Sequence, residues 1–373
     1  MPNPNAIVGR ITRIEPSPDP DERGALSIVV GGEERSLRLD PSDTRSADFA
    51  QVLDGLSKQG LPVYLEIDPA TSSVTRLLIP NVTRIANLRP LDEGILSVEF
   101  QLSHGRHVLR QNLPDYEEFE RQLRVALDSR APLIITEDDA HTIIDVRGFT
   151  PDPEGPLPPY PFPDVPPRVP PRPPFPFNWI KLIIDWLWRP WWPWRLWFRC
   201  ISMTRAQLVF DAMNATSCAP LTVPPPCISF LYPDDGCWAR AHEMCRLMIG
   251  MGHAPKKVWI SGSLYVSTRN SPLCGVWWNW HVAPTLCVRG PGLLQSQQMV
   301  IDPSLFTTPV SKATWKGIQG DPGATLTDTA ASDYLWGTLD PTYVLTNDRL
   351  AYYRLQLQIR AMSSGPPPYA SCP

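Results

Sequence analysis

The stretch Asp234-Asp235-Gly236-Cys237-Trp238-Ala239-Arg240-Ala241-His242-Glu243-Met244 puts a cysteine where a helix is predicted to begin. The two aspartates are residue types that favour the N-cap of a helix, and the glycine allows a tight turn. Apolar residues at helical spacing follow, and they predict a helix that ends near Gly250 or Gly252. A thiol at a helix N-terminus feels the positive end of the helix dipole, which favours the thiolate that attacks carbonyl carbons.

Two segments downstream carry a histidine and a carboxylate. Val276–Ala283 is rich in aromatic and β-branched residues and is predicted to be a strand that contains His281. The apolar run Met299–Phe306 contains Asp302, and the proline after it would close a strand. Papain-like and transglutaminase-like enzymes have this chain order of cysteine on a helix, histidine on a strand and carboxylate at a strand end. In such a trio the histidine takes the thiol proton and the carboxylate orients the ring.

Three blocks of sequence carry a resemblance to a known family. They are residues 232–242, 280–283 and 301–306, which read YPDDGCWARAH, WHVA and IDPSLF. In this order and at similar spacing they closely resemble bacterial protein-glutamine glutaminases, which deamidate glutamine side chains within proteins. The resemblance covers roughly residues 206–355, and no counterpart of residues 1–200 is evident.

The resemblance implies that Cys237 is the nucleophile, His281 the base and Asp302 the acid that orients the base. The implied reaction is hydrolysis of exposed glutamine side chains in protein substrates to glutamate and ammonia through a thioester. Backbone N–H groups at the start of the Cys237 helix are the expected donors to the oxyanion. No cofactor and no metal are expected. A transglutaminase, a cysteine protease or a binding scaffold with a vestigial trio are the alternatives.

Each residue of the trio also has a structural alternative, because buried thiols, core histidines and turn-capping aspartates are common. His242 lies about 140° around the predicted helix from Cys237 and is assigned a structural role, as are Arg240 and Glu243. His253, just past the helix, is assigned to its C-terminal end or the surface. Three tryptophans either wall a slot for a flat amide or belong to the core: Trp277, Trp278 and Trp280.

The predicted fold class is α+β. A papain-like or transglutaminase-like cysteine hydrolase core, with the catalytic helix packed on an antiparallel sheet, is expected within residues 201–373. Residues 1–80 and 81–150 are predicted to be two copies of a small α+β module, because short segments recur at an offset of about 70. Ala25–Val29, for example, recurs as Ile95–Glu99.

Each copy is expected to contain a strand, a hairpin, a helix and two short strands. In the first copy these are Val8–Ile14, Leu26–Leu39, Ala47–Lys58, Val63–Ile67 and Ser73–Leu78. The modules are expected to bind or target a partner, with simple covering of the catalytic domain as the alternative. Their histidines at 104, 107 and 141 lack the spacing of a metal site.

Residues 151–177 form a proline-rich linker, with 14 prolines in residues 151–176. Such a composition cannot pack a core and favours an extended spacer or a docking site for aromatic-lined grooves. Residues 178–200 form a Trp/Arg-rich amphipathic segment, which contains half of the chain's 14 tryptophans. Its charges and prolines exclude a membrane span, but Trp179–Arg199 suits contact with a membrane surface. Packing within the protein, an active-site plug and a partner contact are the alternatives.

The net charge of −4 gives no case for nucleic-acid binding, and the acidity is concentrated in residues 1–150. The first residues, Met1–Asn5, show no signal peptide. Since the family resembled is secreted, the expected location is unknown, with non-classical export and the cytoplasm both open.

All eight cysteines lie from Cys200 onward, so at least one besides Cys237 cannot pair within the chain. Cys218 and Cys227 bracket a proline-rich loop in the family-like region and are the favoured disulfide. Cys274 and Cys287 are a second candidate pair, and Cys245 is predicted to be a buried thiol. A reducing compartment without disulfides is the alternative.

Overall fold

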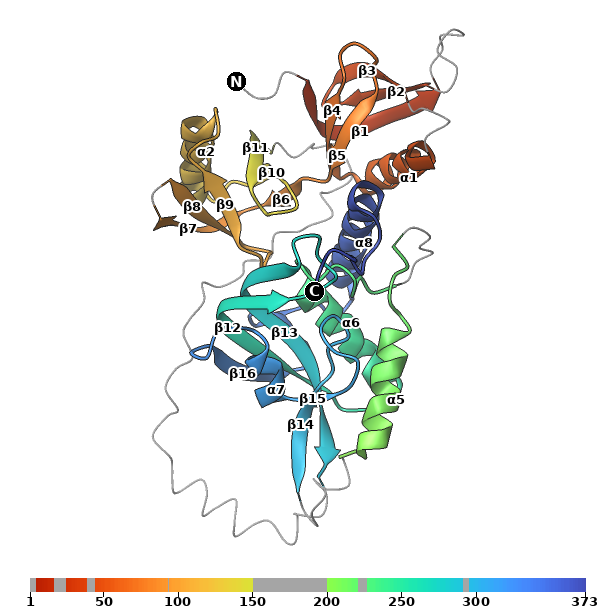
Figure 1. The fold of residues 1–373 in the computed structure, drawn as a ribbon, viewed down its shortest axis with the longest axis vertical. Coiled ribbons are helices and arrows are strands. Elements are labelled where there is room, and N and C mark those ends of the chain that lie inside the picture. Colours follow the sequence, from red (N-terminus) through yellow and green to blue (C-terminus); the bar gives the residue numbers. More distant parts are fainter. Residues whose placement is uncertain are drawn as a thin grey trace.

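The computed structural model of the chain describes residues 5–16, 25–38, 44–92, 94–149, 200–220, 227–290 and 295–373 (Figure 1). It is a mixed structure of antiparallel sheets and few helices, which confirms the predicted α+β class. The proline-rich linker and the Trp/Arg-rich segment up to residue 199 lie outside the described residues. In the described part, no helix combines the length and the apolar character that a membrane crossing requires.

The first N-terminal module is a five-stranded antiparallel sheet in the order β3-β2-β1-β4-β5, with one helix packed on it. Its elements are β1 (Ala6–Pro16), β2 (Ala25–Val30), β3 (Glu33–Arg38), α1 (Thr44–Gln59), β4 (Pro62–Ile67) and β5 (Val74–Leu78). Strand β1 pairs with β4 through its first half and with β2 through its second half. One long strand therefore joins the two halves of this sheet.

The second module repeats this order of strand, hairpin, helix and two strands. Its elements are β6 (Asn81–Thr83), β7 (Ile85–Asp92), β8 (Ile95–Phe100), β9 (His107–Arg110), α2 (Tyr116–Ser129), β10 (Leu133–Glu137) and β11 (Ile143–Gly148). They form two three-stranded sheets, β7-β8-β9 and β11-β10-β6, so β6 and β7 together occupy the place of β1. The predicted element order is thus found in both modules, while their origin by duplication stays a prediction.

The C-terminal part contains a five-stranded antiparallel sheet in the order β15-β14-β13-β12-β16. Its elements are α5 (Met203–Asn214), α6 (Cys237–Gly250), β12 (Lys256–Ser267), β13 (Gly275–Arg289), β14 (Ser296–Val300), β15 (Val310–Ser311), α7 (Lys312–Gly317), β16 (Thr325–Ala330), β17 (Asp333–Leu335), β18 (Thr338–Leu339) and α8 (Val344–Ser364). Helix α6 packs against β13, as expected for a catalytic helix on an antiparallel sheet. A specific kinship with papain-like folds stays a prediction.

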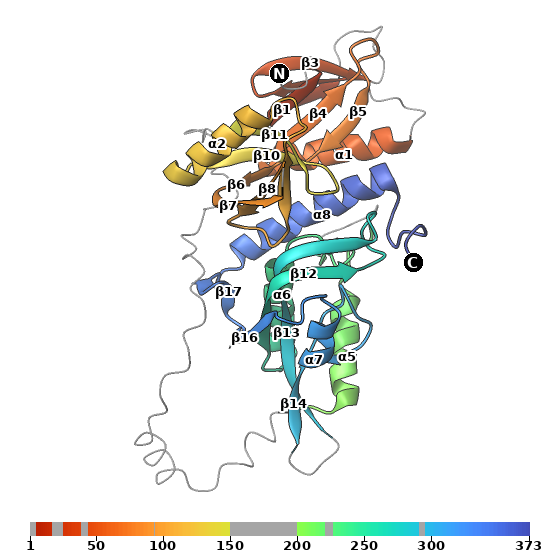
Figure 2. The ribbon, with the colours of Figure 1, turned by 60° about the vertical axis from the view of Figure 1, so that its left-hand side comes forward.

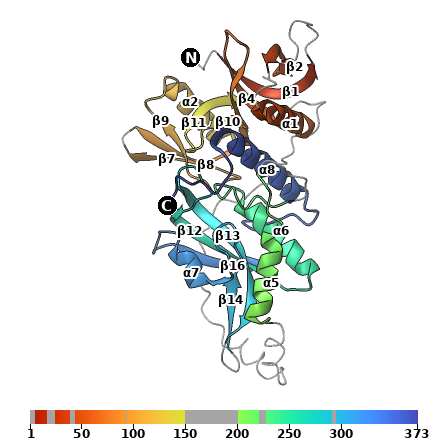
Figure 3. The ribbon, with the colours of Figure 1, turned by 45° about the vertical axis from the view of Figure 1, so that its right-hand side comes forward.

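Helix α8 lies between the first module and the C-terminal sheet, as the views in Figures 2 and 3 show together. It contacts α1 and β5 on one side and α6 on the other. One hydrophobic core runs through all of these elements and includes Leu53 of α1, Leu357 of α8 and Met244 of α6. This shared core holds the N-terminal part against the helix that carries Cys237.

Three disulfides join cysteines of the C-terminal part: Cys200–Cys287, Cys218–Cys227 and Cys274–Cys372. The predicted Cys218–Cys227 pair is confirmed, as is the buried free thiol of Cys245. The predicted Cys274–Cys287 pair is wrong. Cys274 directly precedes β13 and Cys287 lies near the far end of that strand, where an extended chain separates them by roughly 40 Å.

Candidate active site

Cys237 is the first residue of α6, as predicted, and the helix ends at Gly250. The residue that caps the helix is Gly236, with φ of +84°, and a Cβ built there would lie 2.3 Å from the ring of Tyr353. A side chain at this position is excluded both by the left-handed backbone and by the ring. Glycine therefore lets the chain turn into the helix close against α8.

The predicted capping role of the two preceding aspartates is wrong, because neither side chain makes a capping bond to the helix. The carboxylate of Asp234 instead forms an ion pair with Arg360 of α8. Oδ1 of Asp235 accepts the N–H of Gly236 at 2.9 Å. Both carboxylates thus stabilise the turn before the helix rather than its first turn.

His281 lies on β13 and Asp302 follows β14, the neighbouring strand. Nε2 of His281 is 2.9 Å from Oδ2 of Asp302. The same carboxylate accepts from Nε1 of Trp315 at 2.9 Å and from the N–H of Ser304 at 3.2 Å. Burial alone would raise the pKa of Asp302, but the charge of His281 and the hydrogen bonds from His281 and Trp315 hold it below its usual value. Asp302 is therefore an ionised acceptor that fixes the imidazole.

The other ring nitrogen of His281 faces the thiol. Its Nδ1 is buried and has no hydrogen-bond partner among the described residues. Ligand atoms of His281, Cys237 and His104 all lie within 4.8 Å of one another. The indole of Trp278 stacks on the His281 ring with centroids 4.5 Å apart. The structure therefore brings the predicted trio together, with a free nitrogen beside the thiol.

The three tryptophans of β13 have different environments. Trp278 and Trp280 are buried, while Trp277 is exposed. Nε1 of Trp278 also donates to the carbonyl of Asp234, which ties the strand to the turn before the catalytic helix. Their predicted role as walls of an amide slot stays a prediction.

A loop from the second N-terminal module, residues 101–106 between β8 and β9, covers this site. Its Gly105 pairs with Trp278 in an antiparallel bridge, and the N–H of Arg106 donates to the carbonyl of Trp277 at 3.2 Å. The carbonyl of His104 accepts from the N–H of Asn279 at 2.9 Å. Sequence reasoning missed His104, which lies 133 residues before Cys237 and carries no local motif.

The His104 side chain is completely buried beside the trio. Its Nδ1 lies 2.9 Å from the carbonyl of Trp280, and its ring stacks toward that of His281 with centroids 5.7 Å apart. Burial and the charges of His281 and Arg240 lower the pKa of His104 well below its usual value. His104 is therefore a neutral imidazole that fills the space next to Cys237.

The covered state also changes the acidity of the nucleophile. Burial raises the pKa of the Cys237 thiol well above its usual value, and the positive charge of Arg240 and a hydrogen bond from the backbone of Val282 offset this only in part. The expectation that the helix N-terminus favours the thiolate is therefore wrong for this state. Desolvation outweighs the helix dipole while the loop is in place.

The other polar residues of α6 make structural contacts. Arg240 donates to the carbonyls of Tyr232 and Asp235, and Glu243 pairs with a neighbouring arginine on the helix. Nδ1 of His242 lies 2.9 Å from Nζ of Lys257. Burial and the charge of Lys257 lower the pKa of His242 to about 4. These contacts support the structural roles predicted for them.

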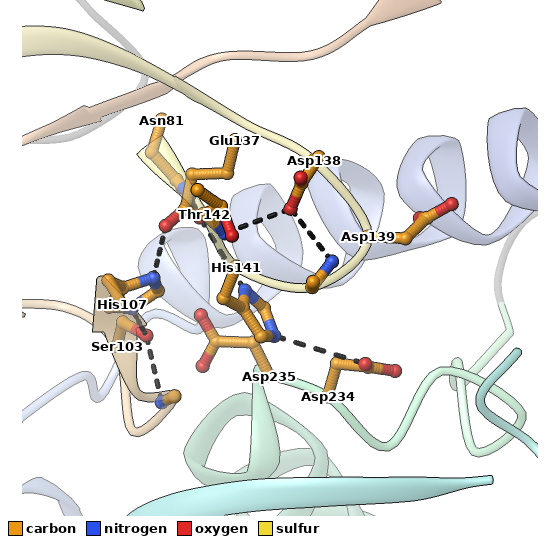
Figure 4. A network of polar contacts seen from close by, with 12 residues as sticks. Asn81, Ser103, His107, Glu137, Asp138, Asp139, His141, Thr142, Asp234 and Asp235 are labelled. Carbon is orange, nitrogen blue, oxygen red and sulfur yellow. Dashed lines mark hydrogen bonds and ion pairs between the residues drawn. The ribbon is translucent and has the colours of Figure 1, made fainter. Parts of the chain in front are cut away.

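A second polar cluster links the two parts behind the covering loop (Figure 4). Nδ1 of His107 bonds to the carboxylate of Glu137, and its Nε2 lies 2.7 Å from Oγ of Ser103 in the covering loop. His141 lies 3.6 Å from the same glutamate and 3.9 Å from Oδ1 of Asp234. Chain spacing gave no sign of this cluster, because the fold alone brings these residues together.

Comparison with known proteins agrees with this site. Residues 206–319 match the model of the family described as Glutaminase, a range that contains all three residues of the trio. The resemblance to protein glutaminases is thereby confirmed for this part of the chain. The match also supports the prediction that the chain is an enzyme of the glutaminase type.

Two solved structures illustrate the similarity beyond that range. A structure titled pro- protein-glutaminase is 21% identical, with a TM-score of 0.49, and the alignment covers 79% of this chain and 99% of that chain. The protein-glutaminase from Chryseobacterium proteolyticum is 27% identical, with a TM-score of 0.38, covering 47% and 97%. The comparison with curated proteins found no match.

Proposed function

We propose that the chain hydrolyses the γ-carboxamide of protein-bound glutamine, with Cys237 as nucleophile, His281 as base and Asp302 as orienting acid. The observation that carries this proposal is the pairing of the two His281 nitrogens. Nε2 is held by Asp302 at 2.9 Å, which leaves Nδ1 unpaired among the described residues beside the thiol. A neutral imidazole in this tautomer is ready to accept the thiol proton.

The chemistry follows from this geometry. Nδ1 of His281 takes the proton of Cys237, and the sulfur attacks the amide carbon to give a tetrahedral oxyanion. The C–N bond then breaks as His281 returns the proton to the leaving nitrogen, releasing ammonia and leaving a thioester. His281 next takes a proton from water, whose oxygen attacks the thioester, and the thiol is restored as glutamate leaves. Backbone N–H groups at the start of α6 are the nearest candidates to stabilise both oxyanions.

Casein separates this proposal from its alternatives. A deamidase releases ammonia and leaves the casein chains intact and uncrosslinked. A transglutaminase would form crosslinks, a cysteine protease would form fragments, and a scaffold with a vestigial trio would do none of these. Crosslinks or fragments in place of ammonia would refute the proposal.

The structure represents a latent form in this proposal. Cys237 is 1% exposed and His104 lies where a glutamine side chain would have to reach the thiol. Turnover therefore requires residues 101–106 to leave the site. A protease recognition sequence inserted within residues 151–199 would let the folded chain be cut between its two parts. Ammonia release should rise at least tenfold once the N-terminal fragment is cut and separated, and equal rates would contradict latency.

Contact with a membrane surface is a further part of this proposal, carried by Trp179–Arg199. The segment has a net charge of +3 from four basic residues and one aspartate, and its tryptophans suit the headgroup boundary. The chain should bind vesicles of anionic lipid at low salt and release them at high salt. Replacing Trp191, Trp192 and Trp194 by Ala should abolish binding, and a wild-type chain that ignores such vesicles would refute it.

A further inference from the structure

Three metal-binding side chains from two parts of the protein meet beneath the covering loop. His104 comes from the second N-terminal module, Cys237 from the start of α6 and His281 from β13. Their ligand atoms all lie within 4.8 Å of one another, and all three residues are buried. A tetrahedral zinc ion holds nitrogen and sulfur ligands roughly 3.3–3.8 Å apart. Small side-chain movements would therefore bring the three atoms onto one ion.

The two imidazoles have the arrangement that metal-binding histidines have. Each uses one nitrogen for an outer partner: His281 donates to Asp302, and His104 donates to the carbonyl of Trp280. Each keeps the other nitrogen free, because Nδ1 of His281 and Nε2 of His104 are buried without a hydrogen-bond partner among the described residues. An outer carboxylate or carbonyl is the usual partner of a metal-bound imidazole, since it fixes the ring and its tautomer.

From this juxtaposition we propose that the latent chain binds one Zn²⁺, or a similar divalent transition metal, through His104, Cys237 and His281. Binding replaces the thiol proton, which passes to solvent, so a Zn–S bond forms as the S–H bond breaks. Three protein ligands leave a fourth position for a water molecule. The ion would satisfy two buried nitrogens that otherwise have no partner.

The charges around the site fit a dication. The thiolate of Cys237 and the carboxylates of Asp235 and Asp302 contribute three negative charges, and Arg240 contributes one positive charge. The resulting charge of −2 is cancelled by one divalent cation. Oδ1 of Asp235 is 3.4 Å from Nε2 of His104, so one of these carboxylates lies directly beside the proposed ligands.

The cluster of His107, Glu137 and His141 is the other candidate for a metal, but its groups are already paired. Both nitrogens of His107 have partners, Ser103 and Glu137, and His141 lies between Glu137 and Asp234. A metal there would have to displace these contacts. At the Cys237 site it would fill vacant bonding positions instead.

The consequence of the metal rests on the proposed function. Zn²⁺ would occupy both the nucleophilic sulfur and the nitrogen that takes its proton, so the bound state cannot start the reaction. Because His104 belongs to the covering loop, the ion would also tie that loop to the catalytic part. Zinc would therefore stabilise latency, and chelation would favour opening.

Cobalt is the probe for this site, because a thiolate bound to Co²⁺ gives a charge-transfer band that a nitrogen or oxygen site lacks. The uncut, metal-free chain should bind one Co²⁺ with this band, and Zn²⁺ should displace it. Cys237→Ser should lose the band, while Cys245→Ser, which alters the other free thiol, should keep it. Absence of the band in the wild type, or its persistence in Cys237→Ser, would overturn the proposal.

A second set of variants tests the ligand from the N-terminal module. His104→Ala should weaken Co²⁺ and Zn²⁺ binding at least tenfold, whereas His253→Ala should bind as the wild type does. Unchanged affinity in His104→Ala, or loss of the band in His107→Ala with full binding in His104→Ala, would place the metal elsewhere and refute the assignment.

Thermal unfolding keeps the test decisive if His104→Ala does not fold. Saturating Zn²⁺ should raise the Tm of the wild type and leave that of Cys237→Ser unchanged, and equal shifts would count against the site. Ammonia release by the cut, metal-free chain is measured separately. The metal site and the proposed activity can therefore fail independently of each other.

Discussion

The backbone N–H of His104 donates to Oδ1 of Asp235 at 3.2 Å, so the covering loop is bonded to the chain two residues before Cys237. The same oxygen accepts the N–H of Gly236, which caps the catalytic helix. One carboxylate oxygen therefore serves both the helix start and the cover. Removing the cover leaves that oxygen bonded to Gly236, so the helix start should survive opening.

Cys237→Ala should abolish ammonia release by the cut chain, because covalent catalysis has no substitute for its nucleophile. Cys245→Ala is the matched control, since it removes the other buried free thiol from the same helix and should retain activity. Rates of ammonia release on casein would decide this. Activity of Cys237→Ala within tenfold of wild type would exclude the assignment.

Asp302→Asn should lower the rate of ammonia release by about 10³- to 10⁴-fold without abolishing it, because an amide cannot hold the same tautomer of His281. Trp315→Phe removes one of the other donors to Asp302 and should cost far less, about tenfold or below. Steady-state rates of the two variants should therefore differ by at least a factor of ten. A silent Asp302→Asn would mean that another group orients His281.

Free glutamine should be a much poorer substrate than a blocked glutaminyl peptide. A site for protein-bound glutamine draws binding energy from the flanking backbone, and a truncated substrate loses rate as well as affinity. The specificity constants kcat/KM of the cut chain for the two compounds provide the comparison. Equal values would indicate an amidase for small molecules instead.

The positions of the trio, the helix that carries Cys237 and the strand that carries His281 could be predicted from sequence, because each depends on local pattern. Helical spacing after Gly236 and aromatic, β-branched residues around His281 are signals of this kind. The capping role assigned to the aspartates was wrong, because their partners lie far away in the chain. Asp234, for example, pairs with Arg360, 126 residues later.

Long-range pairing also explains what the sequence hid in the N-terminal part. His104, His107 and His141 show no metal-site spacing, yet the fold brings the first to Cys237 and the other two to Glu137. The acidity of the thiol likewise depends on burial by a loop that is remote in sequence. Local propensity predicted where the nucleophile is, and only the tertiary structure shows that it is covered.

The cluster of His141, Glu137 and Asp234 should make the stability of the full chain depend on pH. Burial lowers the pKa of His141, but the hydrogen bond and charge of Glu137 and the charge of Asp234, opposed by Arg360, raise it to about 9. The unfolded pKa is about 6.5, so this stabilisation is complete below that pH and is lost as the pH rises through about 9. The free energy of unfolding should fall by on the order of 3 kcal/mol over this range.

Thermal unfolding of the full chain between pH 6.5 and 9.5 would measure this effect. His141→Gln should flatten the pH dependence, and His253→Gln should leave it unchanged, because burial lowers the pKa of His253 and places its titration outside the range. A wild-type slope that survives in His141→Gln would assign the dependence to another group.

Gly236→Ala should destabilise the chain although it adds only one methyl group. The backbone at this position has φ of +84°, and the new Cβ would lie 2.3 Å from the ring of Tyr353. The left-handed conformation costs an alanine about 1–2 kcal/mol, and displacing the buried ring adds about as much again. Gly250→Ala is the control at the other end of the same helix, where a Cβ meets nothing within 4 Å. Calorimetry should show a Tm several degrees lower for Gly236→Ala and an unchanged or higher Tm for Gly250→Ala. Equal Tm values would mean that the turn before Cys237 can relax away from α8, and the close approach of helix and turn would then be of no consequence for stability.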